Sequence, residues 1–120
     1  MRIQLKIAVV SALALCSLNA CKSQYEMLLN SADTEAKYKA AFDYFNNKKY
    51  SRAAAMFESL SMFTEGTEKD DTVRYYWGLS NYRQKDYYTA ETNFQRFLEV
   101  YPRSPFASDA RFLRIDCLYR

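Results

Sequence analysis

The chain has 120 residues, of which 49% are hydrophobic, 26% charged and 17% aromatic, and its formal net charge is +3. This balance indicates one globular domain, excludes an extensively disordered chain, and gives neither a basic stripe for nucleic acid nor a basic run for an anionic membrane. Only two glycines and two prolines are present. These are too few to form the turns of a many-stranded sheet, so the composition favours an all-helical fold.

The N-terminal segment has the pattern of a secretory signal. Arg2 and Lys6 make a basic start, and residues 7–18 (IAVVSALALCSL) form an apolar run. Such a run has the length of a signal-peptide core and is too short to cross a membrane as a helix. We therefore expect residues 1–20 to be a signal peptide.

The residues before Cys21 resemble the lipobox of bacterial lipoproteins. Leu18 and Ala20 stand where that motif has a leucine and a small residue, whereas Asn19 departs from the usual small residue. The resemblance implies cleavage before Cys21, a diacylglycerol on its thiol and an acyl chain on its new amino group. Several acyl chains would hold the protein firmly on a membrane. The alternative is an ordinary secretory signal in which Cys21 has no role.

Cysteine use fits a lipoprotein. Cys16 would leave with the signal and Cys21 would carry the lipid, so Cys117 would be the one remaining thiol. Cys117 lies four residues after Leu113, on the apolar side of a predicted helix. We expect it to be a small buried side chain.

The first long helix is predicted over residues 36–46, after a tether and short lead at residues 21–34. Ser31 and Asp33 offer side-chain oxygens that could cap this helix. Its apolar face has the spacing i, i+3, i+4 and i+7 of an amphipathic helix and consists of Tyr38, Ala41, Phe42 and Phe45.

A second helix is predicted over residues 50–63, with Ala53 at the point where it crosses its neighbour. The segment 64–71 (TEGTEKDD) is a loop, in which Gly66 ends the second helix and Thr67 with Asp70 resembles a capping box for the third. The acidic residues of this loop lack the alternating spacing of a calcium site and complement a helix dipole instead.

The third helix is predicted over residues 71–84, with Gly78 in its middle permitting close contact with another helix. Asp86 is expected to cap a fourth helix over residues 87–101. Ser104 as N-cap and Pro105 as first helical residue predict the start of a fifth helix.

One sequence pattern occurs twice in these predicted helices. KKYSRAAAMFESL around Tyr50 and KDYYTAETNFQRFL around Tyr87 align at a spacing of 37 residues, which also places Ala53 on Ala90 and Phe57 on Phe94. A repeat of this length with helical spacing indicates stacked helix pairs, none of which can bury its apolar face alone.

The repeated positions resemble the tetratricopeptide repeat, whose pattern includes a small residue in the first helix, an aromatic that opens the second, and an alanine three residues later. The second copy supplies Gly78, Tyr87, Ala90, Phe94 and Pro102. The expected fold is therefore an all-α tetratricopeptide solenoid, truncated in its third repeat. We expect these segments: signal 1–20, lipidated tether and lead 21–34, repeat one 35–66, repeat two 67–103, and the first helix of repeat three 104–120.

A lipobox followed by such repeats resembles the BamD family of outer-membrane lipoproteins. The resemblance is carried by the lead CKSQYEMLLNSAD, the first repeat AFDYFNNKKYSRAAAMFESL and the segment RYYWGLSNYRQKDYYTAETNFQRFLEVYPRSPFASDARFL. It implies a lipid-anchored protein on the periplasmic face of the outer membrane. It also implies two partners: a BamA-like barrel-assembly subunit and unfolded segments of outer-membrane proteins.

The concave surface of such a solenoid is lined by the first helix of each pair. An aromatic groove there would suit an extended apolar and aromatic peptide. For each of these side chains, packing against a neighbouring helix is the alternative. By position the candidates are Tyr38, Phe42, Phe45, Asn46, Tyr75, Leu79, Tyr82, Arg83, Phe112, Asp116 and Tyr119.

Two other classes of binding protein stay open. The segment YPRSPFASDA is similar to that of the periplasmic coordinator of the Tol system, a family that usually has a coiled coil and no lipobox. A glycan-binding or nutrient-binding lipoprotein with such repeats would need large inserted loops. We expect no enzyme, no metal and no cofactor besides the lipid, because the chain has no histidine and no phosphate loop or nucleophile with a base partner.

Overall fold

The computed structural model describes residues 24–120, so the predicted signal and Cys21 lie outside the described part. The chain divides into two compact units, residues 1–32 and 33–120. In the first unit, residues 24–29 are helical. Within residues 24–120, the longer helices and the predicted repeats lie in the second unit.

The second unit is all-helical, with no strand between residues 33 and 120. None of the helices in residues 24–120 combines the length and apolar character needed to cross a membrane. The helix bounds agree with the predicted ones to within a few residues. The helices are α2 (Thr34–Asn46), α3 (Tyr50–Thr64), α4 (Asp70–Arg83), α5 (Tyr87–Val100) and α6 (Ala107–Leu118).

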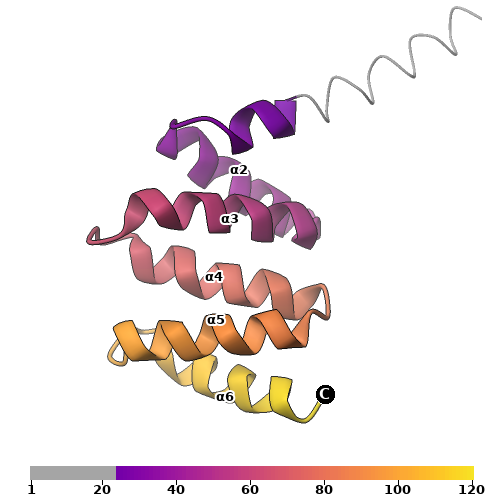
Figure 1. Cartoon of the computed structure of the whole chain (residues 1–120), viewed down its shortest axis with the longest axis vertical. Coiled ribbons are helices and arrows are strands. Elements are labelled where there is room, and N and C mark those ends of the chain that lie inside the picture. The colour runs from indigo at the N-terminus through magenta and orange to yellow at the C-terminus, as the bar shows by residue number, and fades with distance from the viewer. Residues whose placement is uncertain (1–23) are drawn as a thin grey trace, which may run out of the picture. The chain divides into compact units, whose positions relative to one another are not determined.

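Successive helices run in opposite directions and each packs against the next (Figure 1). Helices α4 and α6 also contact each other, although α5 lies between them in sequence. This is the arrangement of stacked helix pairs, so the predicted tetratricopeptide-like solenoid is confirmed. The turn between α4 and α5 lies on one side of the stack, and the turns before α4 and after α5 lie on the other.

The starts of α2 and α5 follow the predicted caps. Asp33 accepts a hydrogen bond from Ala36 N at 3.1 Å, and Asp86 accepts one from Thr89 N at 3.2 Å. Each side-chain oxygen satisfies one of the backbone donors that a helix start leaves unpaired.

The starts of α4 and α6 differ from the prediction. Helix α4 begins without a side-chain cap, and the carboxylate of Asp70 bonds elsewhere. Helix α6 begins at Ala107 rather than at Pro105, because residues 102–106 form a turn. Within that turn, Ser104 Oγ accepts from Phe106 N at 3.2 Å and donates to Asp71 at 2.7 Å. Ser104 therefore fastens the α5–α6 turn to the start of α4.

The core between the helices is built from small residues facing large ones. Ala53 and Ala90 are fully buried, as expected for helix crossings. At Gly78 a Cβ would lie only 2.8 Å from Phe94 Cε1, so the predicted close contact through this glycine is confirmed. Cys117 is a free, buried cysteine, as predicted, and burial raises the pKa of its thiol.

Candidate functional site

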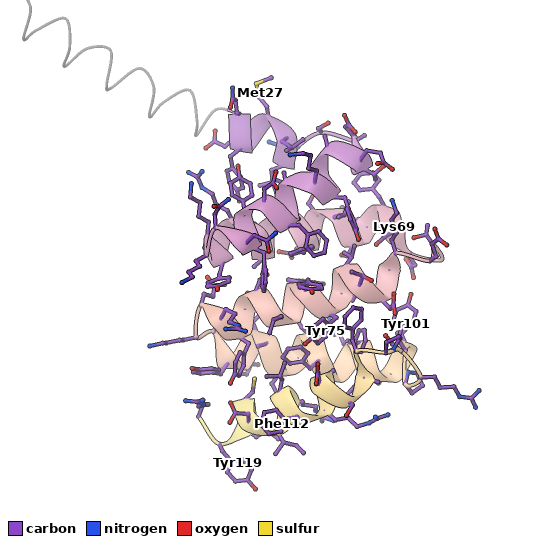
Figure 2. The ribbon with its side chains drawn as sticks, turned by 180° about the vertical axis from the view of Figure 1, so that it is seen from behind. Met27, Lys69, Tyr75, Tyr101, Phe112 and Tyr119 are labelled. Carbon is purple, nitrogen blue, oxygen red and sulfur yellow. The ribbon has the colours of Figure 1, made fainter. Side chains whose placement is uncertain are left out.

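A groove of about 230 Å³ lies between α4 and α6, the first helices of the second and third pairs. Figure 2 shows the face on which its residues Tyr75 and Phe112 lie. Five of the predicted candidates meet here: Tyr75, Leu79, Tyr82, Arg83 and Phe112. Two residues that were not predicted, Asp109 and Leu113, complete the lining.

The floor of the groove is held in place by aromatic packing beneath it. Tyr75 is 6% exposed, and its ring stacks on Phe106 with centroids 4.5 Å apart and planes 11° apart. The rings of Phe94 and Phe97 also pack against Tyr75, with their centroids 6.1 and 6.0 Å from its ring. Burial, followed by the nearby Asp109 carboxylate, raises the pKa of Tyr75 to about 12. The floor is therefore a fixed aromatic ring with a hydroxyl that stays protonated.

One wall is tied to the end of α6. The Tyr82 hydroxyl donates to Asp116 Oδ2 at 2.5 Å, and Arg120 Nε donates to the same oxygen at 3.2 Å. These two donors lower the pKa of Asp116, and the bond to Asp116 raises the pKa of Tyr82. Asp116 thus positions the Tyr82 ring and does not line the groove itself.

The two charged groups of the groove lie at its opposite ends. Arg83 is the last residue of α4, whereas Asp109 is in the first turn of α6. Because α4 and α6 run in the same direction, these residues lie at opposite ends of the two helices. Phe112 stands between them on the rim and is 69% exposed. The groove therefore offers an aromatic surface with one cationic and one anionic end.

The candidates on α2 do not line this groove, and for Phe42 and Phe45 the structure shows the alternative, which is packing against neighbouring helices. Phe42 packs against Phe57 at 5.1 Å and Tyr76 at 4.8 Å, and Phe45 packs against Tyr76 at 5.2 Å. Tyr76 fills the space between α2 and α4, so these rings are part of the packing between helices. In the next repeat, the position of Tyr76 is occupied by Leu113. The shorter side chain leaves the corresponding space open.

The remaining candidates are separate from one another. Asn46 is the exposed last residue of α2, and Tyr119 is 87% exposed just after α6. Neither lines the groove, and Cys21 lies outside the described residues. The signal for the missed Asp109 was its spacing, three residues before Phe112 on the same helix face.

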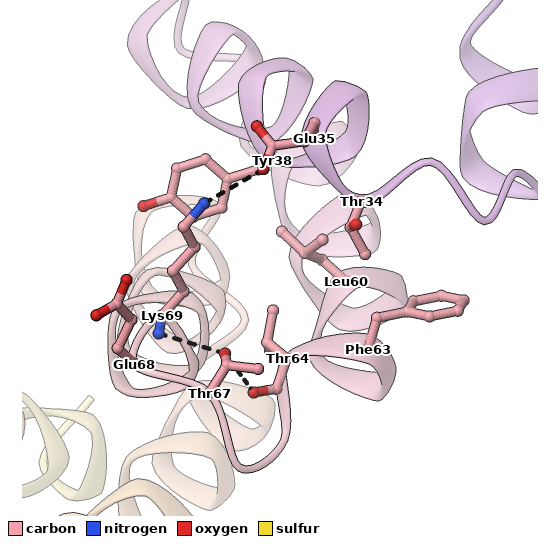
Figure 3. A pocket seen from close by; sticks show the side chains of 9 residues that line it. All are labelled: Thr34, Glu35, Tyr38, Leu60, Phe63, Thr64, Thr67, Glu68 and Lys69. Carbon is pink, nitrogen blue, oxygen red and sulfur yellow. Dashed lines mark hydrogen bonds and ion pairs between the residues drawn. The ribbon is translucent and has the colours of Figure 1, made fainter.

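Tyr38 lines a second, separate cleft, formed by the start of α2, the end of α3 and the loop after it (Figure 3). The ammonium group of Lys69 lies 5.0 Å from the centre of the Tyr38 ring and 3.6 Å from a Glu35 oxygen. Lys69 thereby covers the ring with a cation–π contact. Tyr38 therefore contacts Lys69 in this second cleft and does not line the α4–α6 groove.

Comparison with protein families gave a match over most of the chain. A model of the YfiO family, described as an outer membrane lipoprotein, matches residues 14–120. A search of curated proteins found no significant match to this chain. The matched range includes Cys21 and every helix described above.

Proposed function

Because the chain belongs to the YfiO family of outer membrane lipoproteins, we propose that it is a protein-binding scaffold for the assembly of β-barrel outer membrane proteins. In this proposal the lipid on Cys21 holds the protein on the periplasmic face of the outer membrane. The solenoid then presents the groove between α4 and α6 to segments of unfolded outer-membrane proteins. A barrel-assembly subunit of the BamA type receives those segments.

The observation that supports peptide binding most directly is the groove itself. It is open and aromatic, and its floor is kept rigid by Tyr75 stacked on Phe106. A strand of an outer-membrane barrel alternates apolar and polar side chains. Such a strand, still unfolded, could place its apolar side chains on Phe112 and Leu79. A rigid, preorganised surface reduces the entropy that binding must overcome.

The charges at the two ends would give the bound peptide a direction. An acidic group of the peptide would pair with Arg83, and a basic group with Asp109. The chemistry offered is that of binding rather than catalysis, because Tyr75 is held protonated and the two charged groups stand apart. We therefore propose a scaffold and not an enzyme.

The proposal is tested by crosslinking from the groove in living cells. A photoreactive amino acid replaces Phe112 in the lipidated protein, and a matched control carries it at Met62, which is 74% exposed on α3. We expect crosslinks to unfolded barrel proteins from position 112 and not from position 62. Crosslinks from position 112 only to Tol-system or polysaccharide-uptake proteins would overturn the assembly role.

The anchor is tested separately. Metabolic labelling with a fatty-acid analogue should label the wild-type protein and leave Cys21→Ser unlabelled. Label that persists in Cys21→Ser would place the lipid elsewhere and reject Cys21 as the anchor.

A further inference from the structure

Two lysines occupy an unusual backbone conformation at the same position of both repeats. Lys48, in the α2–α3 turn, has φ of 60°, and Lys85, in the α4–α5 turn, has φ of 68°. The two residues are 37 positions apart, which is the spacing of the repeat. Each turn leads from the first helix of a pair to the second.

Glycine is the residue that adopts this left-handed conformation without steric strain. A lysine can complement the dipole of the helix that has just ended, but a cation in the last turn of the helix would do the same with ordinary backbone angles. The chain uses glycine in this conformation at Gly66, with φ of 80°. Lysine at both equivalent turns therefore points to a role for its charge outside the helix.

Further cations accompany these lysines. Lys49 follows Lys48 directly, and Arg83 precedes Lys85 by two residues. All four side chains are exposed, and in the described part of the chain none of the four forms an ion pair. We call Lys48, Lys49 and Lys85 the basic edge, and Arg83 lies beside it at the end of the α4–α6 groove.

The fold, rather than the sequence, brings the basic edge together. Both turns join a first helix to its second helix, and they lie on the same side of the stack (Figure 1). The α3–α4 turn lies on the opposite side and contains the acidic Glu65 and Glu68. Because the cations come from turns one repeat apart, no basic run is visible in the sequence.

We propose that the basic edge lies against the anionic phospholipid headgroups of the membrane to which this lipoprotein is attached. Ammonium groups on exposed turns can reach headgroup phosphates without burying any protein backbone. The other exposed residues of these turns are the uncharged Asn46, Asn47 and Gln84 and the acidic Asp86, whose carboxylate caps α5. A protein interface would need an apolar centre, and these turns have none among their exposed side chains.

This contact would be a second attachment to the membrane besides the lipid. It would also fix the orientation of the helix stack on the membrane. Stable membrane attachment commonly combines an acyl chain with a basic patch. With the basic edge on the membrane, the α3–α4 turn points away from it and the α4–α6 groove runs from the membrane outward. This orientation does not depend on which peptide the groove binds.

The test measures binding of the full chain carrying Cys21→Ser, which removes the proposed lipid, to two kinds of vesicle. One kind is phosphatidylcholine alone and the other contains about one-third phosphatidylglycerol. The N-terminal apolar segment is the same in every variant, so the ratio of anionic to neutral binding isolates the contribution of charge. We expect a ratio well above one that falls with added salt.

The deciding variant is Lys48→Gly combined with Lys85→Gly. Glycine relaxes both turns, so urea denaturation should show no loss of stability and unfolding cannot explain a loss of binding. At the usual contribution of a lysine near an anionic surface, the ratio should fall by roughly 30-fold. A control with Arg96→Gln and Arg103→Gln removes two exposed cations on α5 and the α5–α6 turn and should leave the ratio unchanged.

Three results would overturn the proposal. The glycine variant could retain the wild-type ratio, or the control could lose as much as the glycine variant, which would mean a general charge effect. The wild-type ratio could also be one while the glycine variant loses an acidic protein that co-purifies with the wild type. That last result would assign the basic edge to a protein partner.

Discussion

At the scale of single residues, Asp70 is an acidic side chain buried inside the second unit. Its side chain is fully buried, and it accepts hydrogen bonds from Thr64 Oγ1 at 2.7 Å, Arg74 Nε at 2.8 Å and the hydroxyl of Tyr101. A buried carboxylate is tolerated only with such partners. The three donors come from the ends of α3 and α5 and from α4, so one carboxylate joins three helices.

Tyr101 should make the stability of the fold depend on pH in the alkaline range. Burial, followed by the bond to Asp70, raises the pKa of Tyr101 to about 12 from its usual 10.0. A raised pKa in the folded state means that the stabilisation is complete below about pH 10 and is lost as the pH rises towards 12. The difference in unfolding free energy between wild type and Tyr101→Phe should be about 1.5–3 kcal/mol at neutral pH and should shrink above about pH 10.

Urea denaturation of both proteins between about pH 8 and pH 11 measures this difference directly. Taking the difference cancels the titration of the lysines, which the two proteins share. If the difference in unfolding free energy stayed constant across this pH range, ionisation of the Tyr101 hydroxyl would have no effect on stability.

The role of Asp70 shows what a sequence pattern leaves out at this scale. Thr67 and Asp70 have the spacing of a capping box, which is a local pattern. The residues that donate hydrogen bonds to the Asp70 carboxylate include Thr64, six residues away, and Tyr101, 31 residues away. The second of these contacts exists only because the helices stack, so no local pattern could predict it.

At the scale of helices, the close contact between α4 and α5 depends on the absence of a side chain at Gly78. Gly78 is buried, and a Cβ there would lie 2.8 Å from Phe94 Cε1 and 3.2 Å from Asn93 Cβ. Alanine is favoured over glycine inside a helix by about 1 kcal/mol, but overpacking a tight contact costs about 1–3 kcal/mol. We therefore expect Gly78→Ala to be destabilising overall.

Chemical denaturation of Gly78→Ala, Phe94→Leu and the double variant tests this crossing. Shortening Phe94 makes room for the new methyl group, so the double variant should be more stable than the sum of the two single effects predicts. An increase in stability for Gly78→Ala alone would mean that the helices do not approach closely here.

The helix ends divide into those that local chemistry determines and those that tertiary contacts determine. The caps at Asp33 and Asp86 were predictable because each carboxylate bonds to a backbone N–H three residues later. Ser104 is predicted in the same way to cap the fifth helix, yet its hydroxyl also donates to Asp71, 33 residues earlier in the chain. That bond holds residues 102–106 in a turn, and α6 begins later than its sequence suggests.

At the scale of the whole second unit, the repeat predicts both the stack and the face on which the groove lies. It does not predict which part of that face is open. Tyr38, Phe42 and Phe45 correspond to Tyr75, Leu79 and Tyr82 one repeat later. Between α2 and α4 the ring of Tyr76 fills the space, whereas between α4 and α6 Leu113 does not. A difference in side-chain volume at one repeated position therefore decides where a ligand can bind.

The repeat itself supplies the substitution that tests this conclusion. Leu113→Tyr copies Tyr76 into the third pair, and its ring should pack between α4 and α6 against Leu79 and Tyr82, as Tyr76 packs against Phe42 and Phe45. We expect binding of a fluorescent peptide from an outer-membrane barrel strand to weaken by about tenfold or more, since a groove filled by one aromatic ring loses its main apolar contacts. Stability in urea should change little, because Leu113 is only half-buried and the added ring meets open space.

Phe112→Ala is the matched variant, because it removes an aromatic ring from the rim of the same groove without filling it. With Phe112 69% exposed, its stability should stay within about 0.5 kcal/mol of wild type, and peptide binding should weaken as well. If Leu113→Tyr bound the peptide as tightly as wild type while Phe112→Ala did not, the ligand would lie on the exposed outer face of α6 and not between the helices. Loss of binding in both variants, with both still folded, is the result that only an occupied α4–α6 groove explains.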